Sequence, residues 1–174
     1  MAQGCNKLMK VGRRQFLRGA GFAAVGAAAT TLPVGETSAA PAGALVKYPS
    51  TRLGNISDLT VDEPFYVAYP DDEAPGILLK LGRRVAGGVG PDGDVVGFST
   101  VCPHKGFPLV YSAADRTLNC PGHYSRFDCE AGGQQTWGQA TQNLPQYGLR
   151  VDEQGNIFAE GVDELLYGRI ANVL

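Results

Sequence analysis

Four side chains of two types stand out because they form two closely spaced pairs. One residue separates Cys102 from His104, and two residues separate Cys120 from His123. The chain contains only two histidines, so finding each of them shortly after a cysteine is hard to attribute to chance. Thiolates and imidazoles are ligands for zinc, copper and iron. The pattern C-x-H-x15-C-x2-H therefore predicts a compact metal centre that two tight loops bring together.

Three interpretations share these four residues. A structural zinc site with two cysteines and two histidines satisfies the ligand count. A [2Fe–2S] cluster uses the same groups when two thiolates bind one iron and two imidazoles bind the other. In the third interpretation the histidines are core residues and the cysteines are free thiols. Zinc explains the ligand count but not the residues that surround the two loops.

The elements that must position these loops are predicted to be short strands of an all-β domain. Glycine and proline are abundant, at 24 and 11 residues, and lie between short apolar runs, which favours a loop-rich β domain. The strand candidates share β-branched or aromatic residues and flanking turn formers: 65–68, 77–81, 95–100, 126–128, 149–151 and 156–159. A helical pattern is predicted only at 163–170. The length favours one domain with its own core.

The charge distribution separates the first 42 residues from the rest. They hold five basic residues and one acidic residue, whereas residues 43–174 hold 10 basic and 16 acidic residues, a net charge of −6. A nucleic-acid partner needs a basic patch, and no run of basic residues follows Arg18. The sequence therefore indicates a protein partner.

Residues 1–42 resemble a twin-arginine export signal. Arg13-Arg14 precedes an uncharged stretch at 19–32, and small residues at 38–42 suit a signal peptidase. This route exports folded proteins, so it suits a protein whose cofactor is inserted before export. The resemblance implies a periplasmic location for a domain at 43–174. Cleavage is left open, and membrane contact is expected at most through an uncleaved signal, because 14 uncharged residues are fewer than the ~20 that span a bilayer.

The residues around both pairs resemble the Rieske family of iron–sulfur proteins. The first pair follows Val95-Val96-Gly97-Phe98-Ser99-Thr100-Val101, and the second lies in Cys120-Pro121-Gly122-His123-Tyr124-Ser125-Arg126-Phe127-Asp128. Gly138-Gln139-Ala140 and then Leu144-Pro145 resemble the loop that covers the cluster. The resemblance implies a Rieske-type antiparallel β-sandwich or barrel, with a small cluster-binding subdomain formed by two loops at about 100–147. It also implies one [2Fe–2S] cluster, with Cys102 and Cys120 on the inner iron and His104 and His123 on the outer iron.

The two loops depart from those of cytochrome bc complexes, in which each loop carries a second cysteine and the two cysteines form a disulfide. The matching positions here are Phe107 and Gly122, so that disulfide cannot form, and the cluster and packing by residues such as Phe107 must hold the loops. Serine and tyrosine hydroxyls near the cluster sulfurs often raise the potential in this family. Ser125 matches the serine, but Phe127 replaces the tyrosine. We therefore expect a potential below that of quinol-oxidising Rieske proteins. Cys129 is expected to be a buried or semi-buried thiol.

The signal, the missing disulfide, Phe127 and the glycine-rich run at 87–93 together resemble the small subunit of periplasmic arsenite oxidase. This resemblance implies an electron-transfer subunit of an oxidoreductase with no catalytic residue of its own. Its partners would be a molybdopterin-containing large subunit that also holds a [3Fe–4S] cluster, in a heterodimer or higher assembly, and a cytochrome c or cupredoxin acceptor. One alternative is the Rieske subunit of a quinol-oxidising cytochrome bc complex. Such a subunit is expected to have a full membrane span, and the uncharged stretch is too short for one. Another alternative is a ferredoxin that supplies a ring-hydroxylating oxygenase. Such a ferredoxin would be cytoplasmic, which the export signal argues against.

Replacing Arg13 and Arg14 together by lysine tests the export signal. The charge is unchanged by this exchange. We expect the variant to be lost from the periplasmic fraction, because the export receptor recognises the guanidinium groups and not the charge alone. Cell fractionation with immunodetection measures this, and exchange of Lys7 and Lys10 for arginine is the control. Normal export of the double-lysine variant would show that the twin-arginine assignment is wrong.

Overall fold

The computed structural model describes residues 47–173, so the export signal predicted for residues 1–42 lies outside the described part. The elements are short strands and a short 3-10 helix. In chain order they are β1 (Thr51–Asn55), η1 (Ile56–Asp58), β2 (Phe65–Ala68), β3 (Pro75–Lys80), β4 (Val95–Ser99), β5 (Val110–Ser112), β6 (Thr117–Asn119), β7 (Arg126–Asp128), β8 (Gln134–Trp137), β9 (Tyr147–Val151) and β10 (Asn156–Val162). No helix between residues 47 and 173 is long and apolar enough to cross a membrane.

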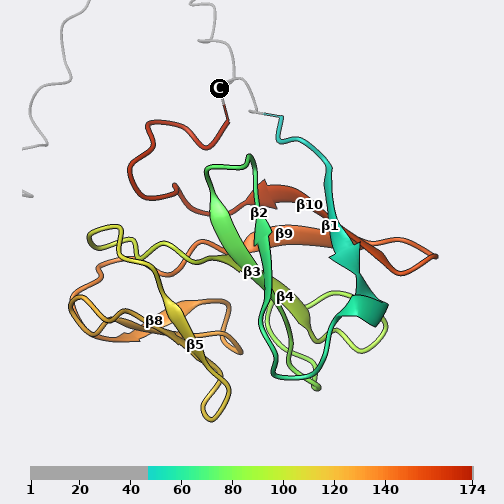
Figure 1. Ribbon diagram of the computed structural model, residues 1–174, viewed down its shortest axis with the longest axis horizontal. Helices are drawn as coiled ribbons and strands as arrows, with labels where there is room; N and C mark the ends of the chain where they lie inside the picture. The colour runs from blue at the N-terminus through green and yellow to red at the C-terminus, as the bar shows by residue number, and fades with distance from the viewer. Residues whose placement is uncertain (1–46, 174) are drawn as a thin grey trace, which may run out of the picture. The chain divides into compact units, whose positions relative to one another are not determined.

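The strands form three antiparallel sheets. Two three-stranded sheets, β1-β10-β9 and β2-β3-β4, make the base of the domain (Figure 1). The four-stranded sheet β5-β6-β7-β8 lies beside them. It falls within residues 100–147, which the sequence predicts to bind the cluster, and is called the cluster-binding part. The base sheets meet where the Ser99 N–H donates to the Pro145 carbonyl at 3.0 Å and Phe98 pairs with Gln146. The predicted all-β architecture of antiparallel sheets is confirmed.

One apolar core crosses from the base into the cluster-binding part. All five residues of β4 are buried, as expected of an apolar strand that is covered on both faces. Phe98 of this strand packs in the same core as Leu118, Phe127 and Leu144 of the cluster-binding part. Because the two parts share this core, the cluster-binding part is fixed to the base by close packing.

The structure confirms the predicted strands and corrects one element. Those at 65–68 and 126–128 have the predicted bounds, and the other four differ at their ends by one to three residues. β1, β5, β6 and β8 have no counterpart among the predicted strands because they are short and partly polar. The helix predicted at 163–170 is wrong. Gly168 there has a φ of 81°, and the Leu166 N–H donates to the Asn172 side chain, so the segment forms turns.

A network of ion pairs joins the base to the cluster-binding part. Arg116, in the turn after β5, donates two hydrogen bonds to Asp62 of the base, at 2.8 and 2.9 Å. It donates a third to Glu130 at 2.8 Å, and Glu130 also pairs with Arg83 of the base. Asp62 and Arg116 both have positive φ angles, of 62° and 51°, which are unfavourable for residues with a Cβ atom. The forked ion pair compensates for this strain.

Stability should depend on pH through this network. Hydrogen bonding from Arg116 lowers the pKa of Asp62, and bonding from Arg83 and then Arg116 lowers the pKa of Glu130. The ionised carboxylates therefore stabilise the fold above their unfolded pKa values of about 4, and this contribution is lost as the pH falls through the lower folded values. Arg116→Ala should lower the urea midpoint at pH 7, and the gap to the wild type should begin to close near pH ~4 and disappear below the lowered folded pKa values. Arg84→Ala is the control, because Arg84 is exposed and makes no ion pair among residues 47–173. A pH-independent gap would mean that the ion pairs do not cause it.

Candidate metal centre

The two loops share one backbone frame. In each loop the cysteine N–H donates to the carbonyl oxygen five residues later, at 2.8 Å, and the cysteine carbonyl accepts from the N–H four residues later. Those fourth residues are Gly106 after Cys102 and Tyr124 after Cys120. Both have a positive φ, 73° and 60°, because this frame needs the left-handed region. Glycine takes that conformation freely, whereas a side chain costs roughly 1–2 kcal/mol.

A third loop closes over the second one through Ser125. The Ser125 hydroxyl oxygen accepts hydrogen bonds from the N–H groups of Gln139 at 3.1 Å and Ala140 at 3.0 Å. These bonds use both of its acceptor positions, so the hydroxyl hydrogen is left for another acceptor. The residue is fully buried. The Gly138-Gln139-Ala140 segment thus packs on the second loop.

The structure brings the four predicted ligand residues together in the two loops that join β4 to β5 and β6 to β7. Cys102 and His104 follow β4, and Cys120 and His123 lie between β6 and β7. The two imidazole rings lie 4.9 Å apart, centroid to centroid, at 79°. The thiols are buried, at 1% and 3% exposure, whereas His104 is half-buried and His123 is exposed. The thiols therefore lie on the inner side of the site and the imidazoles on its outer side.

His104 indicates that this site holds a metal. Its Nδ1 atom is buried and has no hydrogen-bond partner among residues 47–173. An unpaired buried nitrogen costs free energy, and a metal ion is the partner that an imidazole at such a site takes. The two soft thiols beside it complete a donor set that suits iron.

The thiols also fit a cationic centre electrostatically. Burial raises the pKa of Cys102, and the neighbouring Cys120 side chain raises it further. Ligation needs thiolates, and iron supplies the positive charge that makes two adjacent thiolates favourable in an apolar core.

In residues 47–173, no three or more His, Cys, Asp or Glu side chains are grouped closely enough to hold a single metal ion. A [2Fe–2S] cluster requires no such group, because each iron takes two protein ligands. The cysteine pair and the histidine pair meet that requirement.

Phe107 and Gly122 form the contact that replaces the disulfide. A Cβ atom added to Gly122 would lie 2.8 Å from Cγ of the Phe107 ring, so the ring rests directly on the glycine backbone. The same ring meets His123 edge-on, with centroids 5.6 Å apart at 90°. An aromatic ring packed on a glycine thus joins the two loops where the disulfide would otherwise lie.

A contact without a sequence signal holds the first loop from outside. Tyr167, in the segment after β10, lies on Gly106, where a Cβ atom would be 2.5 Å from the tyrosine ring. Two interactions anchor this segment. Arg169 forms a bidentate ion pair with Asp71, and the Asn172 amide donates to the Tyr48 hydroxyl at 2.9 Å. The residues are far apart in the chain, and no periodicity links them.

Phe127 and Cys129 of the second loop region point into the core. Both are fully buried in the same apolar cluster as Cys102 and Cys120. Burial raises the pKa of Cys129 to about 12, and nearby carboxylates add to the shift. Cys129 is therefore a buried thiol, as predicted, and its raised pKa disfavours the thiolate.

The fold and the paired loops define a class of small β proteins that hold one metal centre between two loops. The family model described as "Rieske [2Fe-2S] domain" matches residues 53–148, more than half of the chain. The chain belongs to the Rieske family and binds a [2Fe–2S] cluster. The zinc interpretation is therefore set aside.

Three known proteins show the range of this similarity. The iodate reductase subunit IdrB of Denitromonas iodatirespirans is 40% identical over 164 residues, covering 92% of this chain and 85% of the relative. The Rieske subunit of the cytochrome bc1 complex of Corynebacterium efficiens is 39% identical over 70 residues, which cover 40% of this chain but 17% of the relative. The soluble domain of Rieske protein II (soxF) from Sulfolobus acidocaldarius aligns with a TM-score of 0.64 and 25% identity, over 75% of this chain and 85% of that one.

Gly122→Ala tests the contact between the loops. The added methyl group overlaps the Phe107 ring, and overpacking of this kind typically costs ~1–3 kcal/mol. The cluster absorbance should therefore be lost at a lower temperature than in the wild type. Gly161→Ala is the matched control, because nothing lies within 4 Å of a Cβ atom there. Equal melting of the two variants would show that the ring does not hold the loops.

Phe127→Tyr tests how this position sets the potential. A tyrosine hydroxyl that donates to a cluster sulfur would favour the more negative reduced state by roughly 1–1.5 kcal/mol. The one-electron relation converts this into a rise of about 40–65 mV. Protein-film voltammetry measures it, and Phe65→Tyr in β2 of the base is the control. An unchanged or lower potential with an intact cluster would mean that residue 127 does not face a sulfur.

Proposed function

We propose that this chain is the electron-transfer subunit of an arsenite oxidase complex, between a molybdopterin-containing large subunit and a cytochrome c or cupredoxin. The observation that carries the proposal is one site with buried thiols within and an exposed imidazole at its surface. A [2Fe–2S] cluster held in this way supplies one-electron transfer at a potential above that of an all-cysteine cluster.

In this proposal the chain's own residues hold and tune the centre. Cys102 and Cys120 would hold the inner iron, and His104 and His123 would hold the outer iron. The third loop fills both acceptor positions of the Ser125 hydroxyl, so its hydrogen would be free for a sulfur of the bound cluster. No acid, base or nucleophile is required, because the substrate reacts on the large subunit.

The proposed substrate follows from the resemblance to arsenite oxidase in the signal, the absent disulfide and Phe127. Iodate reduction is a second candidate, because a relative that matches 92% of this chain is an iodate reductase subunit. Arsenite oxidation and iodate reduction are both redox reactions of small oxygen-containing inorganic substrates. The same one-electron carrier would pass electrons away from the large subunit in the first reaction and toward it in the second.

A quinol-oxidising complex is less well supported. The similarity to the cytochrome bc1 subunit covers 17% of that relative, which is enough for a shared cluster domain but not for a shared complex. The proposed location is the periplasm, which rests on Arg13-Arg14 and the uncharged stretch after it.

Purification of the chain with its partners tests this function. We expect a molybdenum-containing large chain, two irons per Rieske chain, a rhombic paramagnetic signal on reduction, and reduction of cytochrome c when arsenite is added. His123→Leu should abolish the signal and the cytochrome reduction while molybdenum stays in the large chain. Surface exchange Glu153→Gln, at the distant β9–β10 turn, is the control.

Each contrary result identifies a different error. Oxidation of the reduced complex by iodate, without a response to arsenite, would favour the second candidate. A cytochrome b without molybdenum would favour the quinol-oxidising complex. Stoichiometric zinc without the paramagnetic signal would contradict the cluster itself.

A further inference from the structure

A pocket opens beside the metal centre on the side of Cys120. It has a volume of about 380 Å³ and is lined by Asn119, Cys120, Tyr124, Ser125, Arg126 and Trp137. Its floor is a predicted ligand of the inner iron and the serine next to it. Neither histidine nor Phe107 lines it. The pocket therefore gives access to the centre by a route separate from the exposed imidazole.

Tyr124 lines this pocket and has a positive φ of 60°, which is unfavourable for a residue with a Cβ atom. The matching position of the first loop is Gly106, which takes the positive φ without strain. The Tyr124 ring is 74% exposed, so packing within the chain does not offset the strain. A strained and exposed aromatic residue indicates a contact outside the chain.

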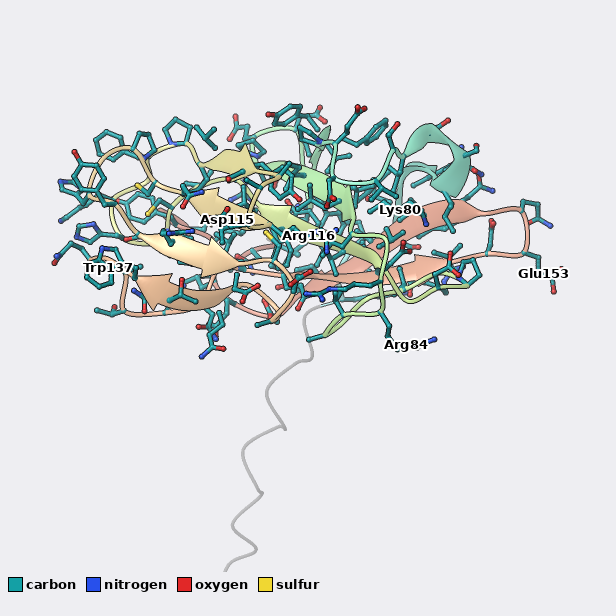
Figure 2. All side chains as sticks on the ribbon, turned by 90° about the horizontal axis from the view of Figure 1, so that it is seen from below. Lys80, Arg84, Asp115, Arg116, Trp137 and Glu153 are labelled. Atoms are coloured by element: carbon teal, nitrogen blue, oxygen red, sulfur yellow. The ribbon has the colours of Figure 1, made fainter. Side chains whose placement is uncertain are left out.

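Trp137 also lines the pocket, and the backbone next to it is fixed by a close contact. Gly138, with a φ of 92°, lies so close to the second loop that a Cβ atom would be 2.4 Å from Cα of Ser125. The tryptophan just before it is thereby held over the pocket, with 69% of its surface exposed. Figure 2 shows Trp137 at the cluster-binding end, away from Glu153 at the tip of the β9–β10 turn.

We propose that this Tyr124–Trp137 pocket is the docking site of the electron acceptor, a basic c-type cytochrome with an exposed haem edge. The inference rests on the proposed function, since it requires an electron carrier. Two aromatic rings around a small hollow suit the flat apolar haem edge, and tyrosine, tryptophan and arginine are the residues that dominate binding at interfaces. The net charge of −6 on residues 43–174 attracts a basic partner over a longer range.

An electron acceptor binds transiently, so it needs only a small interface. Electron-transfer encounters bury less than about 1,200 Å² in total, whereas permanent subunits bury about 2,000 Å² or more. A second group of exposed apolar side chains is available to a permanent partner: Phe107 of the first loop, Val110 of β5, and Leu165 and Tyr167 of the segment packed on the first loop. The large subunit and the acceptor can then bind at different faces of one centre.

The test uses the full chain with its cluster, reduced by dithionite, and oxidised mitochondrial cytochrome c as the probe. Trp137→Ala and Tyr124→Gly should each lower the second-order rate of cytochrome reduction about tenfold, the effect of losing one binding hot spot. They should also weaken cytochrome binding to the oxidised chain, measured without electron transfer from the shifts of the haem methyl NMR signals. Tyr66→Ala is the matched control, because Tyr66 is a 70% exposed aromatic residue in β2 of the base.

Two further measurements separate docking from other effects. Reduction of ferricyanide, a small oxidant that needs no docking site, should be unchanged, as should the midpoint potential. Tyr124→Gly should melt no lower than the wild type, because it removes strain.

Equal cytochrome rates in all variants would overturn the proposal, and so would equal losses with ferricyanide. If the variants instead fail to co-purify with the large chain, this face belongs to the large subunit and the proposal is wrong; absence of any molybdenum chain with the wild type would contradict the proposed function alone.

Discussion

Two thiols buried in one apolar core constrain most of the chain around them. Cys102 and Cys120 lie in the core that β4 shares with the cluster-binding sheet, where a free thiolate would be costly. The centre must therefore be formed with iron present, and the loops must reach it with little freedom. Three sets of interactions restrict the loops in this way: the matched hydrogen bonds at the two cysteines, the hydrogen bonds that the Ser125 hydroxyl accepts, and the ion pairs of Arg116. The histidines lie farther out, since His104 is half-buried and His123 is exposed.

The sequence was sufficient for the parts that repeat a local pattern. Cysteine and histidine spacing located both loops, and alternating or apolar runs located β2, β4 and β7. Short polar strands such as β8 carry no such pattern, because sheet pairing and not their own composition stabilises them. The turn at Gly168 replaced a predicted helix because the Asn172 side chain supplies a competing hydrogen bond from outside the segment. Contacts between distant residues, such as Tyr167 on Gly106, are not encoded in any local window.

The two sides of the centre differ in how they are built. The first loop carries glycine at its strained position and is covered by the segment after β10. The second loop carries tyrosine there and is left open to solvent on that side. A symmetrical backbone frame thus supports two unlike surfaces, and this suits a carrier that must meet two different proteins.

The ring of Phe107 resting on Gly122 also bears on how such proteins evolve. A cysteine introduced at 122 alone would collide with the ring, and a cysteine at 107 alone would leave the space beside the glycine empty. Each single step from the packed form toward a disulfide-linked form therefore passes through a less stable intermediate. The two positions should change together in lineages of this family, and the packed and disulfide-linked forms should persist as separate branches with few mixed sequences between them.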